Sequence, residues 1–385
     1  MSLAKKNITK KNNILSFTFN FIKEEIVFVI ATLVAIISAF FVPPSIEYFS
    51  YIDWDTLFIL FSLMAVVQGL KKEGLFDYFS MVLSKKAKTK KGISFILVFL
   101  CFFMSMFITN DVALITFVPF TIQIFAEKRD NLLIYVIVLE TIAANLGSML
   151  LPIGNPQNLF LFGTMDCSIL DFMLFLLPYV ILSAIILTLL LLFIPAKPLN
   201  ETNNNESEKC DFHLKGNILY GILFFTCILS VTKLLPKYIL IIIVVVVVFI
   251  KDKSIFKKID YMLLLTFMAF FVFTGNIGNI NEIKTFLIDN IKGKELFSGI
   301  IFSQVISNVP AALMLQPFAL NIEKLLIGVN IGGLGTIIAS LASLISFKIY
   351  NTSITKPKSS LYLLIFSLLN ILFLGLLILL AIILD

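Results

Sequence analysis

Long apolar runs separated by short polar stretches dominate this chain and restrict what it can fold into. A helix needs about 20 apolar residues to span the hydrocarbon core of a bilayer. On that rule, clear spans cover residues 26–42, 55–70, 170–194, 216–231, 238–250, 260–274 and 361–384. Of all residues, 59% are hydrophobic and only 14% are charged, whereas soluble domains carry about 25% charged residues. The sequence therefore predicts an all-α polytopic membrane protein.

Two pairs of apolar segments are joined by polar stretches that are too short to leave the membrane. Residues 92–108 and 112–126 are separated only by 109–111, and residues 297–306 and 311–320 only by 307–310. Irregular backbone at membrane depth must be buried in protein or line a water-filled cavity. We therefore expect two re-entrant hairpins, with tips at 109–111 and 307–310 inside the membrane.

Two further apolar segments, 132–162 and 325–347, are interrupted by Gly- and Asn-rich sequences. The first break is expected around 145–158, and the second around 330–343. We interpret both segments as discontinuous helices, whose half-helix N-termini attract anions and whose unwound carbonyls can coordinate a small cation. Residues 74–84 and 280–291 are predicted to form short amphipathic helices at the membrane interface.

The same series of motifs occurs twice along the chain. Residues 52–54 resemble 259–261, 108–110 resemble 306–308, 117–120 resemble 315–318, 145–147 resemble 330–332, and 154–159 align with 339–344. We therefore divide the chain into an N-terminal segment with the first scaffold helix (1–51), repeat 1 (52–195), a polar loop with two scaffold helices (196–259), repeat 2 (260–350) and a C-terminal scaffold helix (351–385).

The distribution of Lys and Arg supports a topology in which the protein spans the inner membrane and its N-terminus lies in the cytoplasm. We count each hairpin as no net crossing of the membrane and each broken helix as one crossing. Most basic residues then lie on the cytoplasmic side, as the positive-inside rule requires. The cytoplasmic set comprises Lys71, Lys72, the basic residues of 85–91, Lys128, Arg129, and the segments 197–215, 251–258 and 348–358. An odd number of crossings separates the repeats, so they are predicted to be inverted, and the C-terminus lies outside.

Several functional classes are disfavoured. The net charge is +6, but the basic residues lie in short loops, where they orient the protein rather than bind nucleic acid. The four cysteines form no CxxC motif and the single histidine, His213, lies in a polar loop, so neither a metal site nor a disulfide framework is predicted. No HExxH motif or Ser/His pair stands at membrane depth, which argues against an enzyme. A channel would keep a continuous polar pore, which paired tips do not suggest.

Polar residues of the tips and breaks form the candidate binding site. Hydroxyl and amide side chains add hydrogen bonds without bulk, and glycine allows close backbone approach. The candidates are Thr109, Asn110, Asp111, Asn145, Gly147, Ser148, Gly154, Asn155, Pro156, Asn158, Ser307, Asn308, Asn330, Gly332, Gly335 and Thr336. The structural alternatives are that Thr109 and Ser307 are N-caps, that the glycines only allow packing, and that 154–158 is a helix start with Pro and a capping Asn.

Two acidic residues, Asp111 and Glu140, lie inside predicted membrane segments. Carboxylates at that depth are costly and usually functional, so each is a candidate site for sodium or a proton. Glu140 could instead pair with an interfacial Lys or lie near a helix end. No Lys or Arg falls inside a predicted span, so an anion would be held by dipoles, amides and a co-bound cation. No cofactor is expected beyond this sodium ion or proton.

The segments ITNDVALITFVPF, NLGSMLLPIGNPQNL and ISNVPAALMLQPF resemble those of the ion transporter superfamily. That superfamily includes citrate-transporter-like permeases, divalent anion/sodium symporters, arsenite permeases and sodium/proton antiporters. The resemblance covers residues 52–350. It implies an elevator mechanism, in which hairpins and broken helices move as a transport domain against a scaffold of the remaining helices, usually in a homodimer.

The hairpin tips depart from one branch of this superfamily. Its dicarboxylate transporters carry Ser-Asn-Thr at the tips, and Thr109-Asn110 and Ser307-Asn308 match the first two positions, while Asp111 and Val309 do not match the third. This departure favours the citrate-like and arsenite-permease-like branches. We therefore expect a secondary active transporter of a small anion, either a carboxylate such as citrate or an inorganic oxyanion, coupled to sodium or protons. An arsenite/antimonite efflux permease or a sodium/proton antiporter of the same fold is the alternative.

Overall fold

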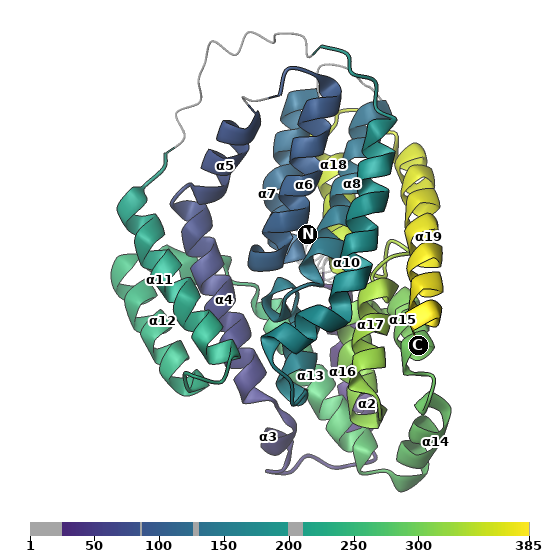
Figure 1. Cartoon of the computed structure of the whole chain (residues 1–385). Helices are drawn as coiled ribbons and strands as arrows, with labels where there is room; N and C mark the ends of the chain where they lie inside the picture. Colours follow the sequence, from purple (N-terminus) through teal and green to yellow (C-terminus); the bar gives the residue numbers. More distant parts are fainter. Residues whose placement is uncertain (1–24, 85–86, 126–130, 199–210, 385) are drawn as a thin grey trace, which may run out of the picture.

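The computed structural model describes residues 25–84, 87–125, 131–198 and 211–384 (Figure 1). Helices make up most of these residues, and no β-strand is present among them. Seven of the described helices are long and apolar enough to cross a membrane: Trp54–Lys72 (α4), Lys90–Ile108 (α6), Asn131–Ser148 (α8), Ile169–Leu192 (α10), Leu214–Val231 (α11), Tyr261–Gly278 (α13) and Ser359–Leu384 (α19). The prediction of an all-α, multi-pass membrane protein is confirmed.

Shorter helices connect and complete this set. They are Ile26–Ala39 (α2), Tyr48–Tyr51 (α3), Leu75–Ser84 (α5), Asn110–Phe125 (α7), Pro156–Thr164 (α9), Lys237–Lys251 (α12), Asn281–Ile291 (α14), Glu295–Ile306 (α15), Asn308–Leu315 (α16), Ile322–Gly332 (α17) and Leu341–Ser353 (α18). In the part of the chain that the structure describes, 3₁₀ turns lie at Pro152–Gly154 (η1), Lys253–Lys258 (η2) and Gln316–Phe318 (η3). The spans predicted at 26–42 and 238–250 are thus α2 and α12, with 14 and 15 residues.

Helix α19 illustrates why these segments pack as they do. Its buried residues are Tyr362, Phe366, Asn370, Phe373, Leu377 and Ala381. They recur every three to four residues, so they form one face of the helix. Leu364, Leu368 and Ile371 on the other faces are exposed, as suits a helix with one side against protein and the other against lipid.

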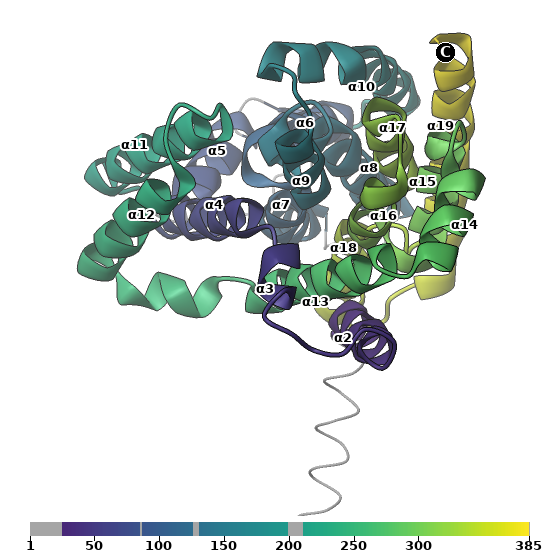
Figure 2. The same ribbon diagram turned by 90° about the horizontal axis from the view of Figure 1, so that it is seen from below.

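The helices can be divided into a bundle and a first group that flanks it in two parts: α4, α11 and α12 lie together at one side in both views, and α2 and α13 lie along the bundle (Figures 1 and 2). In the first group, α4 packs against α11 and α12, and α2 packs against α13. The second group is a bundle of α6–α10 and α15–α19, in which α6, α7, α10 and α19 contact α8, α7 contacts α18, and α15 contacts α17. The groups meet where α13 contacts α16 and where α4 contacts α9.

Similar helix starts occur at the beginning of the two predicted repeats. Asp53 caps α4 with φ −77° and ψ 86°, and its carboxylate accepts a hydrogen bond from the backbone N–H of Thr56. Asp260 caps α13 with φ −78° and ψ 85° and accepts from the N–H of Leu263. The elements that follow have the same order in α4–α10 as in α13–α19.

The two hairpins differ in arm length. The first has arms of 19 and 16 residues (α6 and α7), and the second has arms of 12 and 8 residues (α15 and α16). At about 1.5 Å per residue, α6 is roughly 28 Å long and could cross the bilayer alone, while α15 and α16 are far too short. The argument that too few residues are present for two full helices therefore holds for the second hairpin only.

Candidate functional site

The helix breaks begin later than the sequence suggested. Helix α8 includes Asn145 and Gly147 and ends at Ser148, and α17 includes Asn330 and ends at Gly332. The non-α segments are therefore 149–155 and 333–340, which lie within the ranges 145–158 and 330–343 predicted for the breaks but are shorter than them. Asn and Gly weaken a helix interior but are well tolerated near its C-terminal end.

Each break is hydrogen-bonded to the helix that precedes the other break. Asn155 Nδ2 donates to Asn330 Oδ1 at 3.2 Å, and Asn330 Nδ2 donates to Asn158 Oδ1 at 2.7 Å. These contacts join α17 to the segment that leads into α9. All three amides are buried.

The corresponding contacts are present on the other side. Ser340 Oγ donates to Asn145 Oδ1 at 3.0 Å, and Asn145 Nδ2 donates to Ser343 Oγ at 3.4 Å. Residues 155 and 158 follow Asn145 at the same offsets at which Ser340 and Ser343 follow Asn330. The two pairs of hydrogen bonds therefore join equivalent positions of the two repeats, and each position has the same role as donor or acceptor in both pairs. This is the pattern of an isologous interface. We call these four hydrogen bonds the crossed amide network.

The structure shows a helix start at the first break, as the structural alternative proposed. Asn155 is the N-cap of α9 and accepts from the N–H of Asn158 at 2.9 Å, with Pro156 in the first turn. Asn158 Nδ2 also donates to the carbonyl of Met149 at 3.0 Å. An ideal Cβ on Gly154 would lie 2.0 Å from the carbonyl oxygen of Ser148, so this glycine allows a close backbone approach.

The two hairpin tips share an unusual backbone conformation. Thr109 has φ 68° and ψ 151°, and Ser307 has φ 75° and ψ 154°. In each case the next residue is an Asn whose Oδ1 accepts the N–H of the following residue at 3.0 Å. The side chain of Ser307 makes no capping hydrogen bond to α16, so the N-cap interpretation is wrong for Ser307. Positive φ in a non-glycine residue stores strain and often occurs at functional sites.

The first tip contacts the crossed amide network directly, and the second tip contacts the break beside it. Asn110 Nδ2 donates to Asn145 Oδ1 at 3.0 Å, so Asn145 Oδ1 accepts from both Asn110 and Ser340. At the second tip, the backbone N–H of Asn308 donates to the carbonyl of Ala339 at 2.9 Å. The structure therefore brings both tips and both breaks into one buried polar cluster.

Gly147 and Gly332 pack each hairpin against the following helix. An ideal Cβ on Gly147 in α8 would lie 2.0 Å from the carbonyl oxygen of Phe102 in α6. An ideal Cβ on Gly332 in α17 would lie 2.8 Å from the Ser303 side chain in α15. For these residues the packing interpretation is supported.

Gln304 is a residue of this cluster that sequence reasoning missed. Its Nε2 donates to the carbonyls of Gly332 and Leu334, each at 2.8 Å. Its Oε1 accepts from the N–H of Thr336 at 2.9 Å, and the Thr336 hydroxyl donates to the Gln304 carbonyl at 3.1 Å. Gly335 lies between these contacts with φ 105°. The sequence signal that could have identified Gln304 is its position as a lone Gln within the apolar run before Ser307.

Glu140 lies in the middle of α8 with its side chain fully buried, at 0% exposure. The Thr121 hydroxyl donates to Glu140 Oε1, and Oε2 has no hydrogen-bond partner among the described residues. The two alternatives for this residue, an interfacial Lys partner and a position near a helix end, are therefore wrong.

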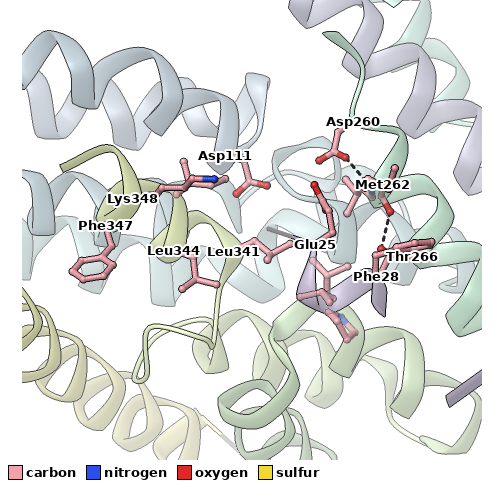
Figure 3. A pocket seen from close by; sticks show the side chains of 15 residues that line it. Glu25, Phe28, Asp111, Asp260, Met262, Thr266, Leu341, Leu344, Phe347 and Lys348 are labelled. Carbon is pink, nitrogen blue, oxygen red and sulfur yellow. Dashed lines mark hydrogen bonds between the residues drawn. The ribbon is translucent and has the colours of Figure 1, made fainter. Parts of the chain in front are cut away.

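A cavity of about 360 Å³ lies between the two helix groups, beside the hairpin tips (Figure 3). Its charged lining residues are Glu25, Asp111, Asp260 and Lys348. Val309 and Pro310 of the second tip line it as well. Lys348 was predicted to lie in a cytoplasmic loop, but α18 continues to Ser353 and includes it. Lys348 nevertheless lies just outside the apolar span predicted at 325–347, so the expectation that no Lys or Arg falls inside a predicted span stays a prediction.

Comparison with known proteins assigns the family. A family model described as "Citrate transporter" matches residues 18–327, most of the chain. The chain belongs to the citrate transporter family. Membership of the citrate transporter family confirms the resemblance to ion transporters and makes the protein a membrane transporter rather than an enzyme.

Individual relatives of this citrate transporter family member are also named as membrane proteins or transporters. An uncharacterized transporter of Methanocaldococcus jannaschii is 33% identical over 312 residues, which cover 80% of this chain and 84% of the relative. The inner membrane protein YbiR of Escherichia coli is 30% identical over 340 residues, 84% of this chain and 87% of the relative. The silicon efflux transporter LSI3 of Oryza sativa is 29% identical over 130 residues, 34% of this chain and 27% of the relative.

Proposed function

We propose that the protein is a secondary active transporter that moves a small anion, either a carboxylate such as citrate or an inorganic oxyanion, across the inner membrane. Transport is coupled to a sodium or proton gradient. The observation that carries this proposal is the crossed amide network, which joins the two helix breaks, together with the hydrogen bonds that connect Asn110 to Asn145 and Asn308 to Ala339 at the hairpin tips. Buried amides and hydroxyls are expensive within a membrane unless they serve a site or a water-filled cavity.

The chemistry of this cluster suits a small polar solute. The residues nearest the breaks are Asn145, Asn155, Asn158, Asn330 and Ser340, which carry amides and hydroxyls that both donate and accept hydrogen bonds. Helices α9 and α18 begin at the breaks, and their N-terminal N–H groups carry partial positive charge. The last carbonyls of α17 accept hydrogen bonds from the N–H groups of Gly333 and Leu334 and from Gln304. A carbonyl oxygen has two lone pairs, so such a group can also meet a small cation.

Alternating access by an elevator-type movement belongs to the same proposal. The bundle of α6–α10 and α15–α19 is the transport domain, and the group of α2, α4 and α11–α13 is the scaffold. Helix α19, which the sequence assigned to the scaffold, is included in the bundle because it contacts α8. The crossed amide network supports inverted repeats, because its equivalent contacts are those expected about a local two-fold axis. Figure 1 supports this too, since α6 and α7 occupy the upper half of the bundle and α15 and α16 the lower half. A homodimer, a cytoplasmic N-terminus and an outside C-terminus complete the arrangement.

A second candidate is supported by the cavity. Three carboxyl groups and one ammonium group line it, and such a surface attracts cations and repels multiply charged anions such as citrate. This charge favours either a cation/proton antiporter or the efflux of a weakly acidic metalloid, such as arsenite or antimonite. The relative named as a silicon efflux transporter also fits a metalloid.

Uptake into proteoliposomes tests both candidates. Citrate, succinate, sulfate, arsenite and silicic acid are offered under imposed sodium or proton gradients to wild type, Asn145→Ala and Asn330→Ala. Saturable uptake of one solute that is lost in both variants supports the proposal and names the substrate. The control is Asn279→Ala in the scaffold, where Asn279 donates to the Tyr51 hydroxyl at 2.7 Å. Gradient dissipation by sodium alone, with no solute transported, would replace the first candidate by the antiporter.

A further inference from the structure

The first turn of α9 contains a buried glutamine whose side-chain oxygen has no hydrogen-bond partner. Gln157 is the second residue of α9, between Pro156 and Asn158, and it is only 1% exposed. No described residue donates a hydrogen bond to its Oε1. Burying an amide oxygen without a donor costs free energy. The Gln157 oxygen therefore needs a donor that the described part of the chain does not supply.

The backbone N–H of the same residue also lacks a partner. The N–H of Asn158 donates to Asn155 Oδ1 at 2.9 Å, and the N–H of Leu159 donates to the Asn155 carbonyl at 3.2 Å. Among the described residues, none accepts a hydrogen bond from the N–H of Gln157. That N–H carries part of the positive charge of the helix N-terminus. Long side chains on a helix point toward its N-terminus, so the Gln157 amide is directed to the same end of α9 as its N–H.

This helix start belongs to the proposed binding site. Asn155 and Asn158, on either side of Gln157, are both hydrogen-bonded to Asn330 in α17. Helix α9 also packs against α16, the second arm of the second hairpin. An unpaired donor and an unpaired acceptor of one residue therefore lie at the break that the crossed amide network holds together.

The second repeat has no amide at the equivalent position. Residues 155 and 158 correspond to 340 and 343, so Gln157 corresponds to Ala342 in α18, which is fully buried. Helix α18 begins in the same way as α9, because the N–H of Leu344 donates to the Ser340 carbonyl as the N–H of Leu159 does to that of Asn155. A methyl group is therefore enough to pack this position of the helix start, and the repeated fold does not require the carboxamide of Gln157.

We propose that Gln157 binds the transported solute and selects solutes that carry a hydroxyl group beside an acceptor oxygen. The Gln157 N–H donates to an oxygen of the solute, and Gln157 Oε1 accepts from the hydroxyl group of the solute. Weak oxyacids such as arsenite and silicic acid offer both groups, and so do hydroxycarboxylates such as citrate, whereas sulfate at neutral pH offers acceptors only. The proposal rests on the proposed transport function and specifies its substrate class.

A solute-binding role and a structural role of Gln157 predict different effects on stability. Gln157→Met keeps a similar side-chain volume and removes a buried oxygen that has no partner, so the solute-free protein should be as stable as wild type or more stable. An amide with a structural role would lose its hydrogen bonds in the same variant, and the unfolding temperature would fall. Gln157→Ala is a second variant, which places the residue of the second repeat in the first.

The experiment measures solute binding by the purified full chain through thermal unfolding, because a ligand of the folded state raises the unfolding temperature. Citrate and tricarballylate form a matched pair, since tricarballylate lacks only the hydroxyl group, and arsenite and silicic acid are compared with sulfate. Each solute is titrated with and without sodium into wild type, Gln157→Met and Gln157→Ala. We expect a hydroxyl-bearing solute to stabilise wild type, and both its hydroxyl-free counterpart and the two variants to show an affinity about tenfold lower or less.

Gln68→Met is the matched control, because Gln68 lies half-buried in α4 of the scaffold. It should leave every affinity unchanged. Equal affinities in wild type and Gln157→Met, equal binding of citrate and tricarballylate, or no stabilisation of wild type by any hydroxyl-bearing solute would overturn the inference. A lower unfolding temperature of solute-free Gln157→Met would overturn it too, as would stabilisation by sodium alone that this variant abolishes. If a solute binds as expected but proteoliposomes do not take it up, the inference stands and the proposed transport fails.

Discussion

Asp111 and Glu140 differ in what surrounds them, although both are acids within the membrane helices. Asp111 lines the cavity between the helix groups, whereas Glu140 is fully buried in α8 and contacts Thr121. No ion pair among the described residues involves Glu140. A carboxylate that is buried without a cation is very costly, so we expect Glu140 to be neutral and only Asp111 to exchange a cation.

Glu140→Gln should therefore be nearly silent, because Gln is neutral, has a similar volume and still accepts from Thr121. We expect a stability change within about 1 kcal/mol for Gln, and a loss of about 2–4 kcal/mol for Glu140→Ala, which leaves a cavity and an unpaired hydroxyl. Thermal unfolding and coupled transport of both variants give the comparison. Loss of proton dependence in Glu140→Gln, with stability intact, would identify Glu140 as the coupling residue instead.

The crossed amide network predicts matched effects on its two sides. Asn330→Ala should destabilise the protein by about 1–3 kcal/mol, because the amides of Asn155 and Asn158 lose a buried partner. Asn145→Ala should cost a similar amount through Ser340 and Ser343. A double-mutant cycle of Asn330→Ala with Asn158→Ala should show a coupling energy of about 0.5–3 kcal/mol. Additive effects in that cycle would show that the hydrogen bond contributes nothing measurable.

At the scale of elements, the contact between α6 and α8 depends on a glycine. A Cβ on Gly147 would meet the Phe102 carbonyl oxygen at 2.0 Å, whereas a Cβ on Gly221 in α11 would meet nothing within 4 Å. Gly147→Ala should therefore destabilise the protein by several kcal/mol by forcing the helices apart. Gly221→Ala should be neutral or stabilising by up to about 1 kcal/mol. The two unfolding midpoints measured side by side check this, and equal midpoints would show that α6 can shift without cost.

The element order was largely predictable because it follows from the apolar pattern of the sequence, which does not depend on how the helices pack. Both hairpins, the amphipathic helices at 75–84 and 281–291, and the cluster of tips with breaks were anticipated from such patterns. The exact position of each break was not predictable, because the groups at a helix end also need partners from distant segments. Gln304, for example, donates to the carbonyls of Gly332 and Leu334 and accepts from the N–H of Thr336. The end of α18 was not predictable for a related reason: the helix packs against α7 and continues past the apolar span predicted at 325–347 to Ser353.

At the scale of the whole molecule, the two helix groups pack against each other, with the rings of Phe160 in α9 and Phe271 in α13 5.5 Å apart, and they also share a cavity wall. The proposed elevator movement requires the groups to slide past each other at this boundary. Val309 in α16 and Thr266 in α13 line this cavity from opposite groups. In a background without native cysteines, we expect a cleavable thiol cross-linker between Val309→Cys and Thr266→Cys to stop transport, and its cleavage to restore it.

The control for this cross-link joins two helices of the bundle. Tyr135 in α8 donates to the carbonyl of Leu190 in α10 at 3.2 Å, so a link between Tyr135→Cys and Leu190→Cys should leave transport intact. Full transport with the first pair cross-linked would rule out relative movement of the two groups at this boundary.

The crossed amide network also has a consequence for biosynthesis. Asn155 and Asn158 are hydrogen-bonded to a residue that lies 175 and 172 positions further along the chain. At about 5–20 residues per second, a ribosome needs on the order of 10–30 s to make the intervening sequence. During that interval the first half is already inserted while its amides lack their final partner. Water, lipid headgroups or an insertion chaperone must therefore shield these amides until the second half arrives.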